Sequence, residues 1–376
     1  MGNTSDAQFI PEFCVWETTL ACNLACRHCG SSAGKPRARE LDTDEALGVL
    51  DALAALGTKE LTFSGGELVV RPDWEQLVAR ARELGIASLV VSNGLAITRE
   101  VAEALAREQV GSVSLSVDGG PRVHDWLRPL NSLRVAECSG PPSPEGASSH
   151  DQLGWAIENL RAAGVTVSAI TQVSKNNLQE LSTVEEFLVA RGIDGWQIQM
   201  TSPMGRSAHA GGAQRVHALE PADFPALYAF IRRVQSEGRI RALAADCIGY
   251  YGADEPLLRS IERPNDNFWQ GCQAGMRVIG ITSDGGVKGC LSMPDAFLEG
   301  NLRERPLGEI WRDERAFAYN RRFEVESLTG GCSGCAFGRL CRAGCHSFAA
   351  TTQDGDISRY DYCIRTCDSG TVTASR

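Results

Sequence analysis

The chain has 376 residues with 37 basic and 47 acidic side chains, a formal net charge of −10, and no apolar run near the roughly 20 residues of a membrane span. Its 43% hydrophobic content suits a globular protein with a substantial core, built as one large domain or two ordinary ones. The acidic balance argues against nucleic acid or an anionic membrane as the main partner. The N-terminus lacks the basic start and apolar stretch of a secretory signal, so we expect a cytoplasmic protein.

The first two-thirds of the chain alternates between β-rich runs and stretches of helical periodicity. We expect strands at 13–20, 60–64, 87–92, 111–117, 165–171 and 194–201, and helices at 43–56, 74–84, 98–107, 152–163, 178–191 and 219–237. Gly164 and Gly192 suit the ends of the fourth and fifth helices. Six strand–helix units imply parallel strands with right-handed crossovers. Because a standard barrel needs eight units, the sequence predicts an α/β fold with an open, partial (β/α)6 TIM-like barrel; a doubly wound sheet is the alternative.

The domain boundaries follow from changes in composition. We expect an N-terminal extension at 1–12, the partial barrel at 13–245, a bridge at 246–271 and a tail at 368–376. Between 272 and 367, glycines and cysteines are dense and helical patterns are scarce, which predicts a small domain organised by metal. The stretch 138–150 is rich in Pro, Gly and Ser and predicts a surface loop, as does 203–214 after the sixth strand.

Fourteen cysteines call for an explanation. A reducing cytoplasm disfavours disulfides, so clustered cysteines there indicate metal ligands or catalytic groups. Eleven of them fall into two groups, one near each end of the chain, whereas Cys14, Cys138 and Cys247 stand alone. We expect these three to be small buried hydrophobic side chains.

The first group is Cys22, Cys26 and Cys29, directly after the first strand. In a barrel of parallel strands this position is the C-terminal rim, where active sites lie. Three thiolates can hold three irons of a four-iron cluster and leave the fourth iron open, whereas an electron relay usually has four cysteine ligands. A zinc site with His28 as fourth ligand is the alternative.

Polar loops follow the next three strands. Gly65, Gly66 and Glu67 come after the second strand, where two glycines allow close approach of the backbone and the carboxylate suits an ammonium group. Asn93 lies in a turn after the third strand, and Ser116 ends the fourth. Four polar loops at one rim, with a three-cysteine loop in the first, predict a binding site there.

These motifs resemble the radical SAM superfamily over residues 13–205, in which a three-cysteine loop is followed by Gly-Gly-Glu. The resemblance implies that Cys22, Cys26 and Cys29 hold a [4Fe-4S] cluster whose open iron binds the amino and carboxylate groups of S-adenosyl-L-methionine (SAM). It further implies that Gly65, Gly66 and Glu67 receive the methionine amino group and that Asn93 and Ser116 line the SAM site. Leu68 stands where many members have proline, which leaves the contact groups intact. In this family the cluster reduces SAM to methionine and a 5′-deoxyadenosyl radical, which abstracts a substrate hydrogen.

The second group of cysteines resembles the SPASM extension of such enzymes, over about 272–363. Its spacing is Cys272-x12-Gly285-x4-Cys290, then Cys332-x2-Cys335-x5-Cys341-x3-Cys345, then Cys363. The resemblance implies two auxiliary [4Fe-4S] clusters, one held by Cys332, Cys335, Cys341 and Cys363, the other by Cys272, Cys290 and Cys345. For the latter we favour an open iron over recruitment of Cys367 or Cys247. On spacing alone, a pair of zinc sites is the alternative.

The resemblance also implies an oxidoreductase that matures ribosomally made peptides by cross-linking, oxidation or epimerisation. The alternatives are oxidation or decarboxylation of a small molecule and a non-catalytic iron–sulfur electron carrier. The implied partners are a precursor peptide and a reductase or flavodoxin-type electron donor. Because 21 residues precede Cys22, we expect either a separate leader-binding protein or direct binding of the peptide by the barrel mouth. No catalytic acid or base can be assigned; Asp118, His124 and Arg128 are candidates because they follow the fourth strand and could reach the rim.

Overall fold

The computed structural model describes residues 9–131, 148–209, 211–259 and 268–367. Within these ranges one sheet of ten strands runs in the order β10-β9-β8-β1-β2-β3-β4-β5-β6-β7. The strands are β1 Phe13–Glu17, β2 Glu60–Ser64, β3 Ala87–Ser92, β4 Ser112–Ser116, β5 Val167–Val173, β6 Gly195–Met200, β7 Ala242–Ala244, β8 Val278–Ile281, β9 Gly286–Lys288 and β10 Gly300–Asn301. All neighbours from β8 to β7 pair in parallel, and β8, β9 and β10 pair antiparallel.

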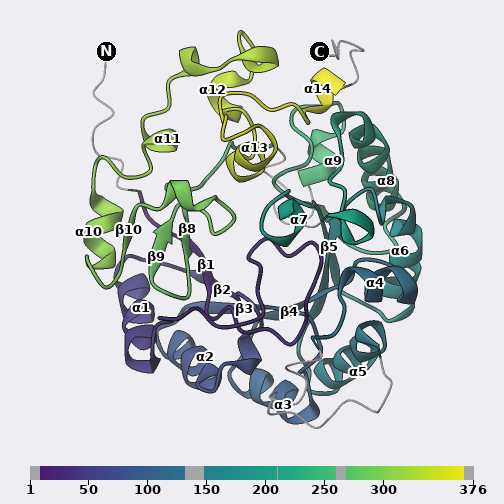
Figure 1. Ribbon diagram of the computed structural model, residues 1–376, viewed down its shortest axis with the longest axis vertical. Coiled ribbons are helices and arrows are strands. Elements are labelled where there is room, and N and C mark those ends of the chain that lie inside the picture. The colour runs from purple at the N-terminus through teal and green to yellow at the C-terminus, as the bar shows by residue number, and fades with distance from the viewer. Residues whose placement is uncertain (1–8, 132–147, 210, 260–267, 368–376) are drawn as a thin grey trace.

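The sheet curves into an open barrel with helices on its outer side (Figure 1). The barrel helices are α1 Thr43–Ala55, α2 Trp74–Glu83, α3 Arg99–Arg107, α4 Pro121–Leu127, α5 Ser149–Ala162, α6 Leu181–Ala190, α7 Arg206–His209 and α8 Phe224–Glu237. The later helices are α9 Glu255–Arg259, α10 Leu307–Arg312, α11 Ala318–Arg321, α12 Gly338–Cys341, α13 His346–Thr352 and α14 Ile364–Cys367. Because β10 and β7 end the sheet without meeting, the expectation of an α/β fold with an open partial barrel is confirmed.

The local sequence sets where several helices begin and end. The Asp42 carboxylate accepts from the Glu45 amide at 2.9 Å and the Glu45 carboxylate accepts from the Asp42 amide at 3.0 Å, a capping box that starts α1. Gly164 and Gly192, expected at helix ends, have φ of 81° and 62°, a conformation that glycine adopts without the strain of a side chain.

The sheet extends beyond the six expected strands on both sides. The short strand β7 adds to β6, and β8 pairs with β1 from Phe13 opposite Val278 to Trp16 opposite Ile281. The cysteine-rich segment therefore contributes three strands to the barrel sheet. Helical patterns are scarce in its sequence, but five short helices, α10 to α14, lie in it. Within the described part of the barrel, 13–245, two helices lie where none was expected, α4 after the fourth strand and the four-residue α7 in the expected loop 203–214.

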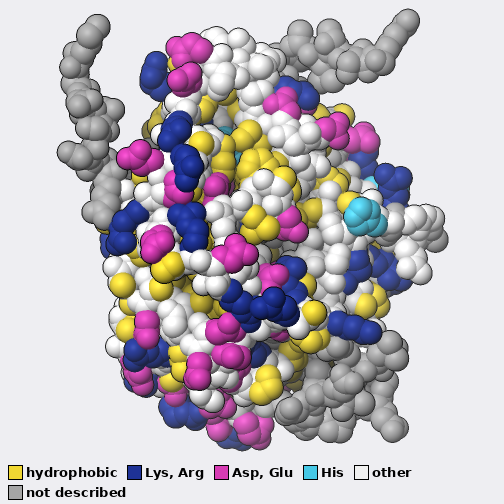
Figure 2. All heavy atoms as spheres, turned by 60° about the vertical axis from the view of Figure 1, so that its left-hand side comes forward, with side chains coloured by type: hydrophobic (Ala, Val, Ile, Leu, Met, Phe, Trp, Pro, Cys, Tyr) yellow, Lys and Arg dark blue, Asp and Glu magenta, His cyan; other side chains and the backbone are white. Residues whose placement is uncertain are grey.

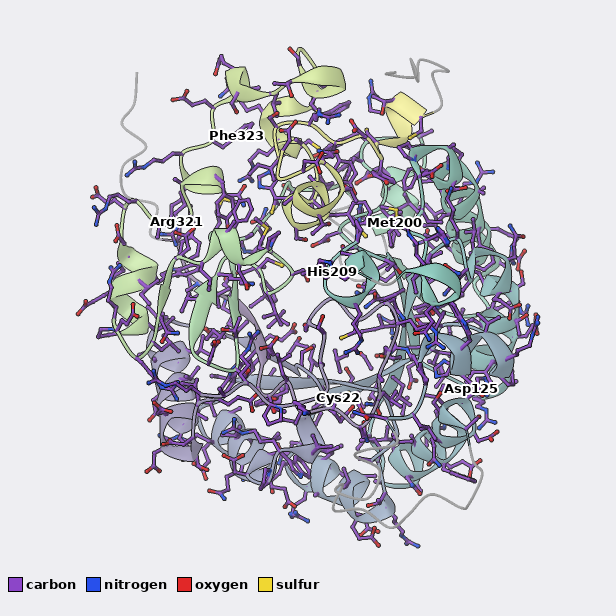
Figure 3. All side chains as sticks on the ribbon, viewed as in Figure 1. Cys22, Asp125, Met200, His209, Arg321 and Phe323 are labelled. Atoms are coloured by element: carbon purple, nitrogen blue, oxygen red, sulfur yellow. The ribbon has the colours of Figure 1, made fainter. Side chains whose placement is uncertain are left out.

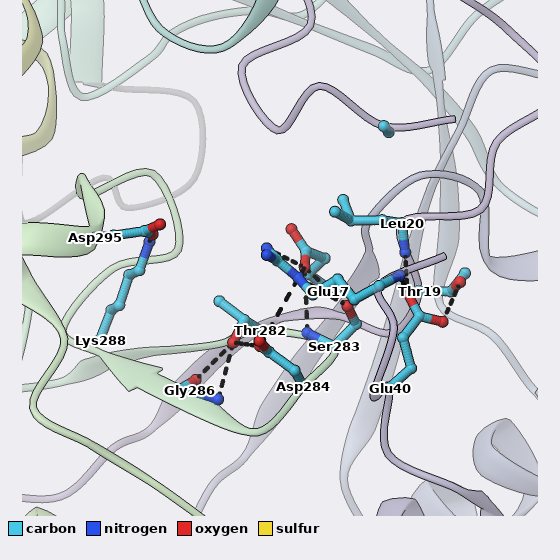
Figure 4. Close-up of polar contacts among 12 residues, drawn as sticks. Glu17, Thr19, Leu20, Glu40, Thr282, Ser283, Asp284, Gly286, Lys288 and Asp295 are labelled. Carbon is cyan, nitrogen blue, oxygen red and sulfur yellow. Dashed lines mark hydrogen bonds and ion pairs between the residues drawn. The ribbon is translucent and has the colours of Figure 1, made fainter. Parts of the chain in front are cut away.

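Buried polar contacts join β1 to the turn after β8 (Figure 4). Glu17, 2% exposed, accepts from the guanidinium of Arg37 at 2.9 and 3.0 Å and from the hydroxyl of Ser283 at 3.1 Å. Beside it, Glu40 accepts from the Thr19 hydroxyl and the Leu20 amide, both at 2.7 Å. A buried carboxylate is tolerated because it is paired and hydrogen-bonded, so these contacts fix the chain where it leaves β1.

One hydrophobic core runs through the barrel and into the C-terminal segment, and residues of the loop that follows β1 form a second, small cluster. Cys14 is 1% exposed inside the main core, which confirms its interpretation as a buried hydrophobic side chain. Cys247 is also buried, and Cys138 lies outside the described residues, as does most of the expected loop 138–150. All thirteen described cysteines are free thiols.

The surface carries charges of both signs. In the view of Figure 2, Lys and Arg side chains are interspersed with Asp and Glu side chains over the described surface. Within the described ranges, no helix has both the length and the apolar character needed to cross a membrane.

Candidate functional site

The loop after β1 carries Cys22, Cys26 and Cys29, and Cys22 lies inside the curve of the sheet (Figure 3). The Cys22 amide donates to the Gly34 carbonyl at 3.1 Å, and the Gly34 amide donates to the Leu20 carbonyl at 2.8 Å. The loop is thereby closed at its base, and Cys22 and Cys26 are both 7% exposed. The structure thus brings the three predicted cluster cysteines together at the rim of the barrel.

Hydrogen-bond donors point at the sulfurs of this loop. The Leu24 amide donates to Cys22 Sγ at 3.5 Å and the Ala33 amide donates to Cys29 Sγ at 3.3 Å. The side-chain amide of Asn93 lies 3.7 Å from Cys22 Sγ, and a guanidinium nitrogen of Arg128 lies 3.7 Å from Cys26 Sγ. Burial raises the pKa of Cys26 to about 11 and that of Cys22 above its usual range, while Arg128 and the Leu24 amide act in the opposite direction. Donors and a cation beside three sulfurs are what thiolate ligands of a metal require, so this donor set fits an iron–sulfur cluster.

The backbone at Gly65 and Gly66 packs directly on the start of the cysteine loop. Gly65 has a φ of 131°, and a Cβ atom built on Gly66 would lie 2.1 Å from the Ala21 carbonyl oxygen. The Gly66 amide donates to the Thr19 carbonyl at 2.6 Å and the Glu67 amide donates to the Ala21 carbonyl at 2.9 Å. Only glycine allows this approach, so the loops after β1 and β2 are held as one unit.

Glu67 is 1% exposed and reaches across to the loop after β3. Its carboxylate accepts from the Ser92 hydroxyl and from the Asn93 amide, both at 2.9 Å. Burial raises the pKa of Glu67 to about 7, although these two donors favour the charged form. Asn93 in turn donates to the Asn23 side chain at 2.7 Å, so three of the predicted rim loops share one hydrogen-bond network. Ser116 is buried at the end of β4 on the same rim.

Asp118 and Arg128 form a buried ion pair beneath the cysteine loop. Arg128 donates to Asp118 at 2.5 Å, and His28 Nε2 lies 3.0 Å from the same carboxylate oxygen. Burial alone would raise the pKa of Asp118, but Arg128 and His28 outweigh it and hold that pKa well below its ordinary range. Because Asp118 is 0% exposed and fully engaged, the geometry favours a positioning role for this pair over direct contact with a substrate.

His124 is equally enclosed. It is 0% exposed, and its Nδ1 accepts from the Asp118 amide at 3.3 Å. Burial lowers the pKa of His124 to about 3, with Arg128 acting in the same direction, so its imidazole is neutral at physiological pH. The three residues considered for proton transfer therefore lie together, behind Cys26.

Arg206, on the short helix α7, was not identified from the sequence. Its guanidinium donates to the carbonyls of Cys26 at 2.6 Å and Ala33 at 2.5 Å, and its amide donates to the Cys29 carbonyl at 3.0 Å. The only signal available was its position in the loop after the sixth strand, at the same rim. His28, considered only as a zinc ligand, was likewise missed as the partner of Asp118.

The C-terminal cysteines separate into two groups of interacting thiols. Burial raises the pKa of Cys341 to about 12, and the charges of Cys363, Cys332 and Cys335 act in the same direction. Burial raises the pKa of Cys332 to about 11, again with Cys363 and Cys335 as neighbours. These four cysteines, which the resemblance assigned to one auxiliary cluster, therefore lie close together.

The second group lies on the barrel side of the first. Burial raises the pKa of Cys290 to about 11, with Cys272 as a neighbouring charge, and Cys345 is in turn influenced by Cys272. Burial would also raise the pKa of Cys272, but His346 and Asn320 outweigh it and lower that pKa to about 7. Among the described residues, no three Cys, His, Asp or Glu side chains converge as closely as a single bound metal ion requires.

A pocket of about 380 Å³ lies between the barrel and the C-terminal segment. Its lining includes Pro203 and Ser207 beside α7, Val216 and Leu219 before α8, and Thr352 and Tyr362 from the C-terminal segment. Arg206, which lies in sequence between Pro203 and Ser207, donates to the Cys26 carbonyl in the cysteine loop. The pocket therefore adjoins the segment that supports the cysteine loop, and its volume is in the range of small-molecule binding sites.

Comparison with known proteins identifies the class that this fold and site define. The Radical SAM superfamily profile matches residues 16–188, and an iron-sulfur cluster-binding domain, SPASM, matches residues 272–336. The chain is 30% identical over 364 residues to an AdoMet-dependent heme synthase of Methanosarcina barkeri, and the aligned region covers 94% of this chain and 96% of that protein. It is 31% identical over 343 residues to the mycofactocin maturase MftC of Mycobacterium ulcerans, over 88% and 82% of the two chains.

A solved structure agrees with the fold. Streptococcus suis SuiB, crystallised with its precursor peptide SuiA, superposes with a TM-score of 0.67 at 17% identity, over 94% of this chain and 75% of that one. The chain belongs to the radical SAM superfamily and is an enzyme with a C-terminal SPASM domain.

Proposed function

We propose that this enzyme binds SAM and a [4Fe-4S] cluster at the rim of its barrel and acts on a ribosomally made peptide. When bound, the cluster supplies the electron that cleaves SAM and generates the radical that abstracts a substrate hydrogen. The observation that carries the proposal is the donor set around Cys22, Cys26 and Cys29, together with the glycine contact that brings Glu67 to the same rim.

Each rim residue has a role in this proposal. Cys22, Cys26 and Cys29 hold the cluster, and Asn93 and Arg128 stabilise the charge on its sulfur ligands. Glu67, held by the Ser92 hydroxyl and the Asn93 amide, faces the ammonium group of SAM in its charged form. Gly65 and Gly66 allow the close approach of the two loops, and Ser116 lines the SAM site from the end of β4. Burial of the site excludes water from a reactive intermediate.

The C-terminal domain would hold two auxiliary clusters, the first on Cys332, Cys335, Cys341 and Cys363, the second on Cys272, Cys290 and Cys345. The separation of the thiols into these two groups supports the assignment. An external reductase or flavodoxin-type protein would supply electrons, and a separate leader-binding protein would help to present the substrate.

The likeness to MftC over 88% of the chain supports a peptide substrate. The experiment is co-expression with the short peptide encoded nearest to this enzyme, followed by mass spectrometry. We expect the loss of two hydrogens for a cross-link or an oxidation. An unchanged mass would be followed by a repeat in deuterated water, in which epimerisation adds one deuterium; no deuterium would count against that peptide as substrate.

The cluster assignment has its own test. Anaerobic reconstitution with iron, sulfide, SAM and dithionite should release 5′-deoxyadenosine, which a non-catalytic electron carrier would not produce. The Cys26→Ala variant should lose this product. If that variant cleaved SAM at the normal rate, the assignment of the first cluster would be wrong.

The likeness to the heme synthase over 94% of the chain favours a second candidate, oxidation or decarboxylation of a small molecule of the tetrapyrrole class. A further relative, named Fe-coproporphyrin III synthase, is 26% identical over 87% of the chain. Incubation of the reconstituted enzyme with an iron porphyrin that carries propionates distinguishes the two candidates. A change in the mass of the porphyrin with no change in the mass of the peptide would establish the tetrapyrrole reaction.

A further inference from the structure

Cys247 lies at the same rim as the predicted cluster site, after a strand that was not expected. It follows β7, which extends the sheet beyond β6, and the Ala245 amide donates to the Ile198 carbonyl at 2.9 Å. The Sγ atom of Cys247 accepts from the Met200 amide at 3.3 Å, where β6 ends. Its position after β7 matches that of Cys22 after β1.

Two tyrosines tie the backbone at Cys247 to the C-terminal domain. The Tyr250 hydroxyl donates to the Asp246 carbonyl and accepts from the Cys345 amide at 3.0 Å. The Tyr360 hydroxyl donates to the Cys247 carbonyl at 2.6 Å, and the rings of Tyr250 and Tyr360 meet edge to face at 5.1 Å. A single phenol oxygen therefore bridges the segment before Cys247 to Cys345.

The two thiols also act on each other electrostatically. Cys345 is half-buried, and of the charges that raise the pKa of its thiol, those of Cys247 and Cys272 have the largest influence. His346 is 1% exposed, its Nε2 lies 2.6 Å from the Arg342 carbonyl oxygen, and its ring acts on Cys272, whose pKa it lowers. The other cysteine considered as a ligand, Cys367, lies elsewhere: its sulfur is 3.6 Å from the Asp361 carbonyl, beside Tyr362.

The surroundings of Cys247 differ from those of a cysteine that serves only in packing. An N–H donor faces its sulfur, as amides face Cys22 and Cys29 in the first cluster loop. Cys14 is also buried, but among the described residues no hydrogen-bond donor faces its sulfur. Backbone donors to sulfur are a regular feature of iron–sulfur ligands because they stabilise the thiolate.

We propose that Cys247 is the fourth protein ligand of the auxiliary cluster held by Cys272, Cys290 and Cys345, an inference that rests on the proposed function in placing a cluster there. The thiol would release its proton to solvent as it binds iron. This ligand replaces the open iron favoured from the sequence and also the packing role expected for Cys247. A cluster with four cysteine ligands conducts electrons and has no iron free to bind a substrate thiolate.

The experiment uses the full chain with Cys22, Cys26 and Cys29 all changed to Ala, so that the auxiliary clusters alone contribute. Cys247→Ala and Cys247→Ser are each added, with Cys14→Ala as the matched control. The reconstituted proteins are analysed for iron and sulfide and, after reduction with dithionite, by electron paramagnetic resonance (EPR) with and without cyanide. We expect the parent and Cys14→Ala spectra to be insensitive to cyanide. Cys247→Ala should lose about half of its iron or become sensitive to cyanide, and Cys247→Ser should keep its iron with a shifted spectrum.

Two results would overturn the proposal. One is a parent protein that already responds to cyanide, because its auxiliary iron would then be open. The other is a Cys247→Ala protein with the same iron content and the same cyanide-insensitive spectrum as Cys14→Ala. Circular dichroism on each variant separates loss of a ligand from loss of the fold. A parent protein that binds no iron after reconstitution would instead refute the auxiliary clusters themselves, and the ligand assignment with them.

Discussion

At the scale of single residues, the contact between Gly66 and the Ala21 carbonyl couples two loops that carry different functions. A methyl group on Gly66 would lie 2.1 Å from a backbone oxygen, so one of the two loops must move. We expect Gly66→Ala to lose the cluster of the first cysteine loop, seen as a fall of about one-third in iron per reconstituted chain. Gly48→Ala is the control, since nothing lies within 4 Å of a Cβ at that position in α1. Equal iron content in the two variants would contradict the coupling.

The raised pKa of Glu67 predicts a pH dependence of SAM binding. Burial places this pKa near 7, so the carboxylate is largely protonated at pH 6 and largely charged at pH 8. If the charged form receives the ammonium group, SAM affinity should rise about tenfold between these pH values, as measured by equilibrium binding to the reconstituted enzyme. Glu67→Gln should bind weakly with no such rise. The proposed role of Glu67 would be refuted by an unchanged pH profile in Glu67→Gln.

The residue types at the rim were predictable, but their partners were not. Glycines followed by a glutamate after the second strand indicated a binding loop, yet nothing in the sequence relates Glu67 to Ser92, 25 residues later. His28 was considered as a metal ligand because it lies between cysteines, whereas its contact with Asp118 depends on the path of the loop after β4. Such pairings arise from tertiary structure and have no local signal.

At the scale of elements, α7 acts as a support for the cysteine loop. Arg206 donates to two carbonyls on either side of Cys29, and both acceptors belong to the loop. We expect Arg206→Ala to weaken retention of the first cluster, seen as faster loss of the SAM-dependent change in its EPR spectrum during dialysis against a chelator. Arg122→Ala, at an exposed position of α4, is the matched control. The same rate of loss in both variants would exclude this role for α7.

The long elements followed from the sequence, and the short ones did not. Each of the six strands from β1 to β6 lies within or overlaps an expected run, because alternating or continuous apolar patterns persist over five residues or more. The strands β7, β9 and β10 have three, three and two residues, which is too short for a period to be recognised. The pairing of β8 with β1 joins residues more than 260 positions apart, so no local sequence pattern predicts it.

At the scale of the whole molecule, the C-terminal segment has little regular structure of its own. The helices α12, α13 and α14 span four, seven and four residues, so we expect bound clusters to supply much of the order of 325–367. Removing iron with a chelator should speed amide hydrogen exchange in this range by at least about tenfold, whereas β2 to β5 should stay protected. Mass spectrometry of peptic fragments makes the comparison, and anaerobic return of iron and sulfide is the control. Unchanged exchange would mean that packing alone orders the segment.

The central place of β1 also has a consequence for synthesis on the ribosome. Its two neighbours in the sheet are translated at very different times. The strand β2 comprises residues 60–64, whereas β8 comprises residues 278–281. At 5–20 residues per second, the 265 residues between Phe13 and Val278 take roughly 13 to 53 s to translate. For that interval one edge of β1, the strand that leads into the cysteine loop, has no partner and is open to pairing with other chains. We therefore expect a nascent chain of this enzyme to need protection of this edge of β1 until β8 has been made.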